Sequence, residues 1–436
     1  MIGALIYFVA RYIYSAIFSS NKVISRKHLI TTCSSANMSS EPRQAVLHKP
    51  PPLTAKILYS IILNAGKTLA ALSRGLQGLK ENIWPPNVRP DLIKTYQCRP
   101  HLPVRIFLPA AHDASSPHVY PVLFVIVGGG WFMGYNKEHD EWNRAFADTQ
   151  STVVIGLDHS KAPKSPFPGP VHDIEALILA ALADETIPID RSSRHPTNRV
   201  AILGFASGGN LALAVSQLPS IHNHSLAPAA VMCVAGVLDL SISTERKLEN
   251  RYYKPALKPS KRGGKDSLGP VMPALCWGYV PYGVDLCNPL LSPGYADLSM
   301  LPAHVGLVGA ELDFLAHEAW RLACRLSREG AGVDHGTPDP ESRETQWRIV
   351  GQEQVHSGNP LRGLGEGVPD ERFAFEEHWQ GGGVKWLLVP DVLHGFDNRF
   401  YREMDTRRED IRDAEVKTEA YMRELGTWLR ERVWRL

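Results

Sequence analysis

The strongest constraint on the fold is an alternation of short apolar runs with longer helical patterns that begins near residue 100. Each run is rich in Val, Ile and Leu over nearly its whole length, so both of its faces must be buried. Strands of this kind are typical of a mostly parallel sheet covered by helices on both faces. The α/β fold predicted in this way has strands at 104–108, 122–127, 153–157, 200–204, 229–235, 304–308 and 384–389. Its helices are expected at 172–183, 209–217, 314–329 and 413–434.

The length of 436 residues and the apolar content of 44% allow one large core with insertions. We divide the chain into a hydrophobic N-terminal segment (1–30), an arm with an amphipathic helix (31–99) and the α/β domain (100–436). Two irregular stretches interrupt that domain: 239–293 is rich in Pro, Gly and aromatic residues, and 334–381 is polar. Long connections are usually lids or insertions. We expect a lid in the first stretch and a surface insertion in the second.

The N-terminal segment is the only targeting signal in the sequence. Residues 2–18 are almost wholly apolar, interrupted by Arg11, and three cations follow between residues 22 and 27. A membrane-spanning helix needs ~20 apolar residues, and a central arginine costs roughly 2.5–3.5 kcal/mol on insertion scales. One hypothesis is a single membrane anchor with the globular part in the cytosol, as the positive-inside rule places it. The alternative is a soluble cytoplasmic chain that starts at Met38.

An amphipathic helix is expected next. From residue 58 to residue 79 the apolar positions recur at spacings of three and four, with lysine and arginine between them. A basic amphipathic helix can lie on a membrane surface. Packing onto the α/β domain is the commoner outcome, and we favour it here.

Several classes of function find no support in the composition. The net charge of +2 comes without a concentrated basic face, so nucleic acid is not an expected partner. The six cysteines are scattered with no C-x-x-C pair, which suits neither a zinc site nor a disulfide framework. H-E-x-x-H, G-x-x-x-x-G-K-[ST] and a Rossmann glycine pattern are all missing from the sequence. We therefore expect no metal and no cofactor.

Residues 204–210 read G-F-A-S-G-G-N and follow a predicted strand directly. In a G-x-S-x-G nucleophile elbow the serine sits on a strained turn between a strand and a helix. Here Ala206 lies midway between Gly204 and Gly208, and the serine is Ser207. Either Ala206 occupies the apex and Ser207 starts the helix, or Ser207 occupies the apex. The first register is sterically easier, because the second places Phe205 where the turn needs glycine.

A glycine-rich loop follows another predicted strand. Residues 127–131 read V-G-G-G-W. Consecutive glycines let backbone N–H groups face a substrate without a Cβ in the way. Such N–H groups form an oxyanion hole, in which one donor is worth ~2.7–4 kcal/mol of the barrier.

A carboxylate and an imidazole follow two later strands. Asp313 comes after the strand at 304–308, and His394, in L-H-G-F, comes after the strand at 384–389. At the carboxyl ends of neighbouring strands they can form the orienting pair of a catalytic triad. The chain order of nucleophile, acid and base is that of α/β-hydrolases.

Together these motifs resemble those of the hormone-sensitive-lipase-like α/β-hydrolases, which are marked by H-G-G-G-[FW] and G-D-S-A-G-G-N. The resemblance runs from about residue 100 to the C-terminus, and D-H-S-K-A-P-K at 158–164 is similar to the family's D-Y-R-L-A-P-E. It implies an α/β-hydrolase fold with a lid and an esterase-type activity. It also implies Gly129 and Gly130 as backbone oxyanion donors. A looser similarity is to fungal hydrolases of biosynthetic pathways.

The chain departs from the family pattern at three places. Val127 replaces the motif histidine, Phe205 replaces the aspartate, and the order Ala206-Ser207 inverts Ser-Ala. The first two positions do not supply reacting atoms. The third concerns the nucleophile itself.

The leading hypothesis is a carboxylester hydrolase, of esterase or lipase type, that acts on a hydrophobic ester or lactone in secondary-metabolite biosynthesis. In it Ser207 is the nucleophile, His394 the general base and Asp313 its orienter. One alternative is a non-covalent biosynthetic enzyme in which the Asp–His pair transfers a proton. Another is a catalytically silent hydrolase fold that binds a small molecule or a partner protein.

Overall fold

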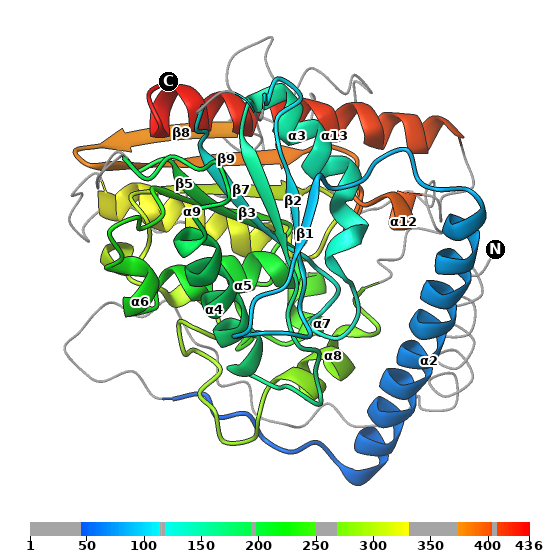
Figure 1. The fold of residues 1–436 in the computed structure, drawn as a ribbon. Helices are drawn as coiled ribbons and strands as arrows, with labels where there is room; N and C mark the ends of the chain where they lie inside the picture. The colour runs from blue at the N-terminus through cyan, green and yellow to red at the C-terminus, as the bar shows by residue number, and fades with distance from the viewer. Residues whose placement is uncertain are drawn as a thin grey trace.

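A central sheet organises the molecule, with helices on both of its faces (Figure 1). The computed structural model describes residues 45–113, 115, 118–192, 198–249, 268–330, 374–402 and 408–436. In this part of the chain the sheet has nine strands in the order β1-β2-β4-β3-β5-β6-β7-β9-β8. The six strands from β4 to β9 pair in parallel, whereas β1, β2 and β8 are antiparallel additions at the edges. The predicted α/β fold with a mostly parallel sheet is confirmed.

All seven predicted strands are present, within one or two residues of their predicted ends. The strands are β1 (Leu92–Lys94), β2 (Val104–Phe107), β3 (Val122–Ile126), β4 (Val153–Leu157), β5 (Val200–Phe205), β6 (Ala230–Val234), β7 (His304–Ala310), β8 (Ala374–Trp379) and β9 (Gly382–Val389). The sequence did not reveal β1 and β8. Both are edge strands with partly exposed side chains, so they lack the continuous apolar run that marks a central strand.

The alternation of side chains along each strand builds two cores. In β3, Phe124 and Ile126 face the core that lies under α4, α5 and α9, while Leu123 and Val125 face the core under α3 and α13. The helices are α2 (Leu53–Ile83), α3 (Asp140–Gln150), α4 (Gly169–Ala183), α5 (Ser207–Ser216), α6 (Pro219–His222), α7 (Thr244–Glu249), α8 (Met272–Tyr279), α9 (Ala316–Gly330), α12 (Arg399–Arg402) and α13 (Arg408–Trp428). Figure 1 shows α3 and α13 on one face of the sheet and α4, α5 and α9 on the other.

The amphipathic helix of the N-terminal arm is α2, which is longer than the predicted 58–79. It packs against α8, where a Cβ on Gly278 would lie 2.8 Å from Leu63 Cδ1. Packing onto the α/β domain, the favoured expectation, is therefore observed. In Figure 1 α2 runs along one side of the molecule.

Three predicted segments lie wholly or partly outside the described residues. The hydrophobic segment 1–30 is wholly outside, as are 250–267 of the predicted lid and most of the predicted insertion. The end of that insertion is strand β8 and its turn into β9. Among the described residues, no helix is both long enough and apolar enough to cross a bilayer.

Candidate active site

The topology of the sheet brings the glycine-rich loop and the elbow together. Strand β3 lies between β4 and β5. After β3 the chain forms β4 on one side of β3, and it later forms β5 on the other side. The crevice at the carboxyl ends of strands at such a switch point is the usual ligand site of an open α/β sheet. The loop after β3 and the turn after β5 both open onto this crevice.

The apex of the elbow is Ala206. Its φ of 51° and ψ of −117° are a strained backbone conformation for a residue with a Cβ, and the turn is held by Ala206 N donating to Val234 O at 2.8 Å. Glycine is required on either side. A Cβ on Gly204 would lie 2.0 Å from Gly208 O, and a Cβ on Gly208 would lie 2.3 Å from Ile126 O. Of the two registers left open by the sequence, the structure adopts the one with a methyl group at the apex.

Ser207 is the first residue of α5 and is buried. Its Oγ accepts a hydrogen bond from Trp131 N at 3.1 Å. Within the described part of the chain no hydrogen bond joins Ser207 to His394. One residue beyond the apex, the Ser207 hydroxyl is directed toward the glycine-rich loop, and its role as nucleophile stays a prediction.

The glycine-rich loop adopts backbone conformations that favour glycine. Gly129 and Gly130 have φ values of 110° and 64°, and a Cβ on Gly128 would lie 3.3 Å from Ala206 Cβ, so the loop runs directly beside the apex. Among the described residues, no acceptor takes a hydrogen bond from the N–H groups of Gly129, Gly130 or Ser207. These three donors are available to a developing oxyanion.

Trp131 fixes this loop through its main chain. Its N–H donates to Ser207 Oγ, and its carbonyl accepts a hydrogen bond from Ala162 N at 2.9 Å. Ala162 belongs to the 158–164 loop that resembled a family motif. Ser207 is thus joined by a hydrogen bond to the glycine-rich loop.

The predicted acid–base pair is brought together. His394 Nδ1 donates to Asp313 Oδ2 at 2.7 Å, from loops that follow the adjacent strands β9 and β7. Asp313 also accepts a hydrogen bond from Leu315 N at 3.0 Å, and its side chain is fully buried. The His394 side chain is 12% exposed, so it can reach a bound substrate. The hydrogen bond to the carboxylate orients the imidazole and favours the tautomer with its proton on Nδ1.

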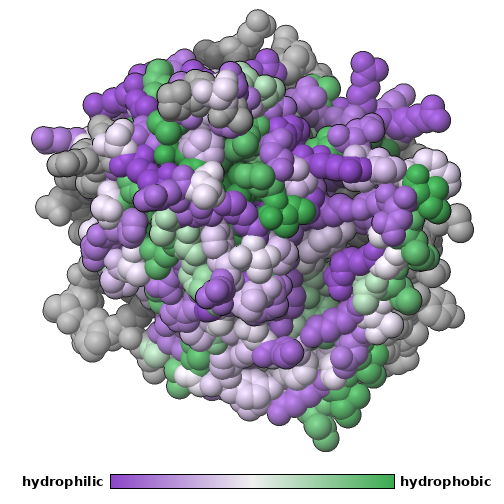
Figure 2. Space-filling model, in the orientation of Figure 1, coloured by the Kyte–Doolittle hydropathy of each residue, from purple (hydrophilic) through white to green (hydrophobic). Residues whose placement is uncertain are grey.

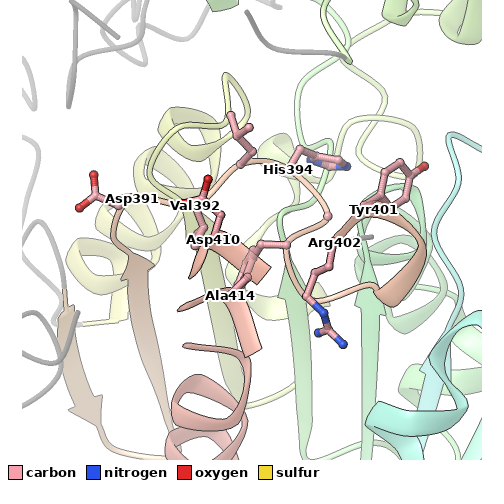
Figure 3. Close-up of a pocket in the computed structure, with 10 residues that line it drawn as sticks. Asp391, Val392, His394, Tyr401, Arg402, Asp410 and Ala414 are labelled. Carbon is pink, nitrogen blue, oxygen red and sulfur yellow. The ribbon is translucent and has the colours of Figure 1, made fainter. Parts of the chain in front are cut away.

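A second set of hydrogen bonds, which the sequence did not reveal, holds the His394 loop. Tyr421 Oη of α13 donates to Asp397 Oδ2 at 2.9 Å and accepts from Trp142 Nε1 at 3.0 Å. Burial raises the pKa of the Asp397 carboxyl. Figure 3 shows His394 on this loop at the rim of a hollow, with Arg402 directed away from the imidazole.

Helix α8, within the segment predicted as a lid, covers the oxyanion loop. The rings of Trp131 and Tyr279 stack at 4.3 Å with an angle of 4°, and both are fully buried. A Cβ on Gly130 would lie 2.7 Å from Leu275 Cδ1. The cover over the site is therefore apolar.

The comparisons with known proteins agree with this architecture. A family model described as the alpha/beta hydrolase fold matches residues 123–337. An arylesterase of Saccharolobus solfataricus is 28% identical over 231 residues, covering 52% of this chain and 68% of the relative. A carboxylesterase of Mycobacterium tuberculosis is 27% identical over 262 residues, covering 57% and 74%.

Solved structures show the same fold. A hyperthermophilic esterase from Pyrobaculum calidifontis matches with a TM-score of 0.54 at 18% identity, covering 86% of this chain and 97% of that one. The chain thus has the α/β-hydrolase fold, and over that part its sequence is similar to those of esterases.

Proposed function

We propose that this site hydrolyses hydrophobic carboxylic esters with a water molecule activated by His394, and that no acyl-enzyme forms at the elbow. The observation that carries the proposal is the methyl group of Ala206 at the apex of a turn that lies at the same edge of the sheet as the His394–Asp313 pair and the glycine-rich loop. An alanine lacks the oxygen that a serine would direct at the carbonyl. In this proposal a water molecule supplies the attacking oxygen instead.

The remaining groups can carry out the hydrolysis. Nε2 of His394 takes a proton from the water as its oxygen attacks the ester carbonyl, and Asp313 stabilises the imidazolium that forms. The carbonyl oxygen becomes the oxyanion and accepts hydrogen bonds from the N–H groups of Gly129, Gly130 and Ser207. The tetrahedral intermediate then breaks its bond to the alcohol oxygen, which receives the proton from His394. The products are one carboxylic acid and one alcohol.

The substrate class follows from the cover of the site. The apolar side chain of Leu275, which lies against Gly130, supports an aliphatic or aromatic ester or a lactone as substrate. A role in secondary-metabolite biosynthesis stays a prediction.

The test compares ester hydrolysis by the wild type, Ser207→Ala and His394→Ala. We expect steady turnover of a p-nitrophenyl ester by the wild type without an initial burst, because no acyl-enzyme accumulates. Ser207→Ala should keep most of that activity, whereas His394→Ala should lose about 10²–10⁴-fold. Equal losses in the two variants, with a burst in the wild type, would identify Ser207 as the nucleophile. A wild type that turns over no ester would make the site a binding site.

A further inference from the structure

Helix α2 has an exposed face that its packing does not use. The face is formed by seven large apolar side chains that are between 48% and 72% exposed: Leu53, Ile57, Ile61, Leu72, Leu76, Leu79 and Ile83. We call these residues the α2 stripe. Their spacings of three, four and eleven place them on one side of the helix. In Figure 2 hydrophobic atoms gather along the right and lower right edge, where Figure 1 shows α2.

The opposite side of α2 is held on the α/β domain by cations over aromatic rings. Lys67 Nζ lies 5.2 Å from the ring centroid of Phe132, and the Arg74 guanidinium lies 6.0 Å from that of Tyr135. Lys56 makes the same kind of contact with Tyr282, at 5.4 Å. These contacts fix the rotation of the helix about its own axis. The stripe is therefore kept facing outward.

Polar contacts strengthen this attachment. Tyr135 Oη donates to Gln77 Oε1 at 3.0 Å, and Lys137 forms an ion pair with Glu81. Glu81 is the only acidic residue of α2, which carries four lysines and arginines. The helix is therefore cationic as well as amphipathic.

We propose that the α2 stripe docks on the interface of an anionic phospholipid bilayer, with the helix axis parallel to the membrane. Three observations favour this occupant. The helix of 31 residues is about 45 Å long, so the stripe can make an extended contact with a plane. The exposed Lys80, next to Leu79 at the border of the stripe, complements anionic headgroups. Trp84, directly after α2 and 68% exposed, is a side chain that prefers the membrane interface.

Docking in this way would bring the cover of the active site to the membrane surface. Helix α2 contacts α8 and the residues that follow the oxyanion loop, through Leu63 and Lys67. A hydrophobic molecule dissolved in the bilayer would then lie close to the lid. The docking itself does not depend on which mechanism the site uses.

The test reads the environment of the stripe directly in the full chain. An environment-sensitive fluorescent amino acid is incorporated at residue 76, in the stripe, or at residue 119, where Val119 is 47% exposed on another surface. Vesicles contain phosphatidylcholine with or without phosphatidylserine, together with a spin-labelled lipid as quencher. We expect a blue shift and quenching at residue 76 that require phosphatidylserine, and neither effect at residue 119.

A matched pair of variants controls for unspecific binding. Leu72→Glu with Leu79→Glu should abolish the shift at residue 76, whereas Met300→Glu with Val416→Glu, also at exposed apolar positions, should leave it unchanged. All four positions are exposed, so thermal melting should be unaffected. Binding to vesicles without a change at residue 76 would overturn the proposal, because another segment would then be the anchor. A blue shift that is already present without vesicles, whether or not it rises with protein concentration, would also overturn it, because the chain itself would cover the stripe.

Discussion

The two halves of the catalytic site differ in how much of the hydrolase machinery they keep. The acid–base half is complete, since His394 donates to a buried Asp313 at 2.7 Å and Asp313 is in turn fixed by Leu315 N. The nucleophile half keeps the strained turn but carries a methyl group at its apex. The backbone geometry of the elbow therefore does not require a serine at its apex.

The reason lies in what each half requires sterically. The turn depends on Gly204 and Gly208, where any Cβ would meet backbone atoms closer than 2.5 Å. The structure forms this turn with an alanine at residue 206. Serine can thus be lost from the apex without loss of the fold. The hydroxyl of Ser207 accepts a hydrogen bond from Trp131 N.

Placing a serine at the apex should have the largest effect. In subtilisin, loss of the nucleophile lowers kcat by ~10⁶. We expect Ala206→Ser to recover part of this factor and to raise ester hydrolysis on the order of 10³-fold, with a burst of the alcohol product. Stopped-flow kinetics with a p-nitrophenyl ester measures both. A folded Ala206→Ser variant with no increase in ester hydrolysis would contradict this expectation, because residue 206 and His394 would then not be aligned for reaction.

The acid–base half of the site depends on the carboxylate of Asp313, which orients His394. Asp313→Asn removes the charge that stabilises the imidazolium and favours the wrong tautomer of His394, so activity should fall about 10²–10⁴-fold. The same substitution in an Ala206→Ser background should cancel the gain described above. A variant that loses its fold instead of its activity would be recognised by circular dichroism.

The oxyanion loop is shared by both halves, and its disturbance should have an intermediate effect. A methyl group on Gly130 would lie 2.7 Å from Leu275 Cδ1, and the φ of 64° is unfavourable for alanine. We expect Gly130→Ala to lower kcat by about 10–100-fold through displacement of the oxyanion donors. Gly75→Ala, at a helix position where a Cβ meets nothing within 4 Å, is the matched control and should leave kcat unchanged.

The smallest effect on catalysis is expected from the support of the His394 loop. Tyr421→Phe leaves the buried Asp397 carboxylate and Trp142 Nε1 without their partner, which should lower the free energy of unfolding by about 1–3 kcal/mol. The hydrogen bond from Tyr421 lowers the pKa of Asp397 and so favours its ionised form. The loss should therefore be largest at neutral pH and shrink as the pH falls through the pKa of Asp397. Denaturant unfolding of both proteins at several pH values measures it.

Much of the fold could be predicted because the central strands are apolar on both faces, which few other structures tolerate. Helix α3 could not be found in this way. Its buried side chains Trp142 and Phe146 stand among charged residues, so the apolar pattern is hidden. Strand β8, with the sequence A-F-E-E-H-W, has the mixed composition of an edge.

Of the candidate site, the sequence predicted the acid–base pair but not the arrangement of the elbow. Strand order and motif position predicted the meeting of Asp313 and His394. The register of the elbow depends on the backbone angles of residue 206, and the hydrogen bond from Trp131 to Ser207 joins residues 76 positions apart. No local pattern encodes such a contact. The same holds for the bond between Trp142 and Tyr421, which lie 279 positions apart.

Intact-protein mass spectrometry after treatment with a fluorophosphonate probe tests the central claim most directly. Such probes react covalently with an activated serine. The account predicts an unmodified mass for the wild type and one added probe for Ala206→Ser, mapped to the peptide that contains residue 206. A wild type labelled at Ser207, with labelling abolished by Ser207→Ala, would contradict it.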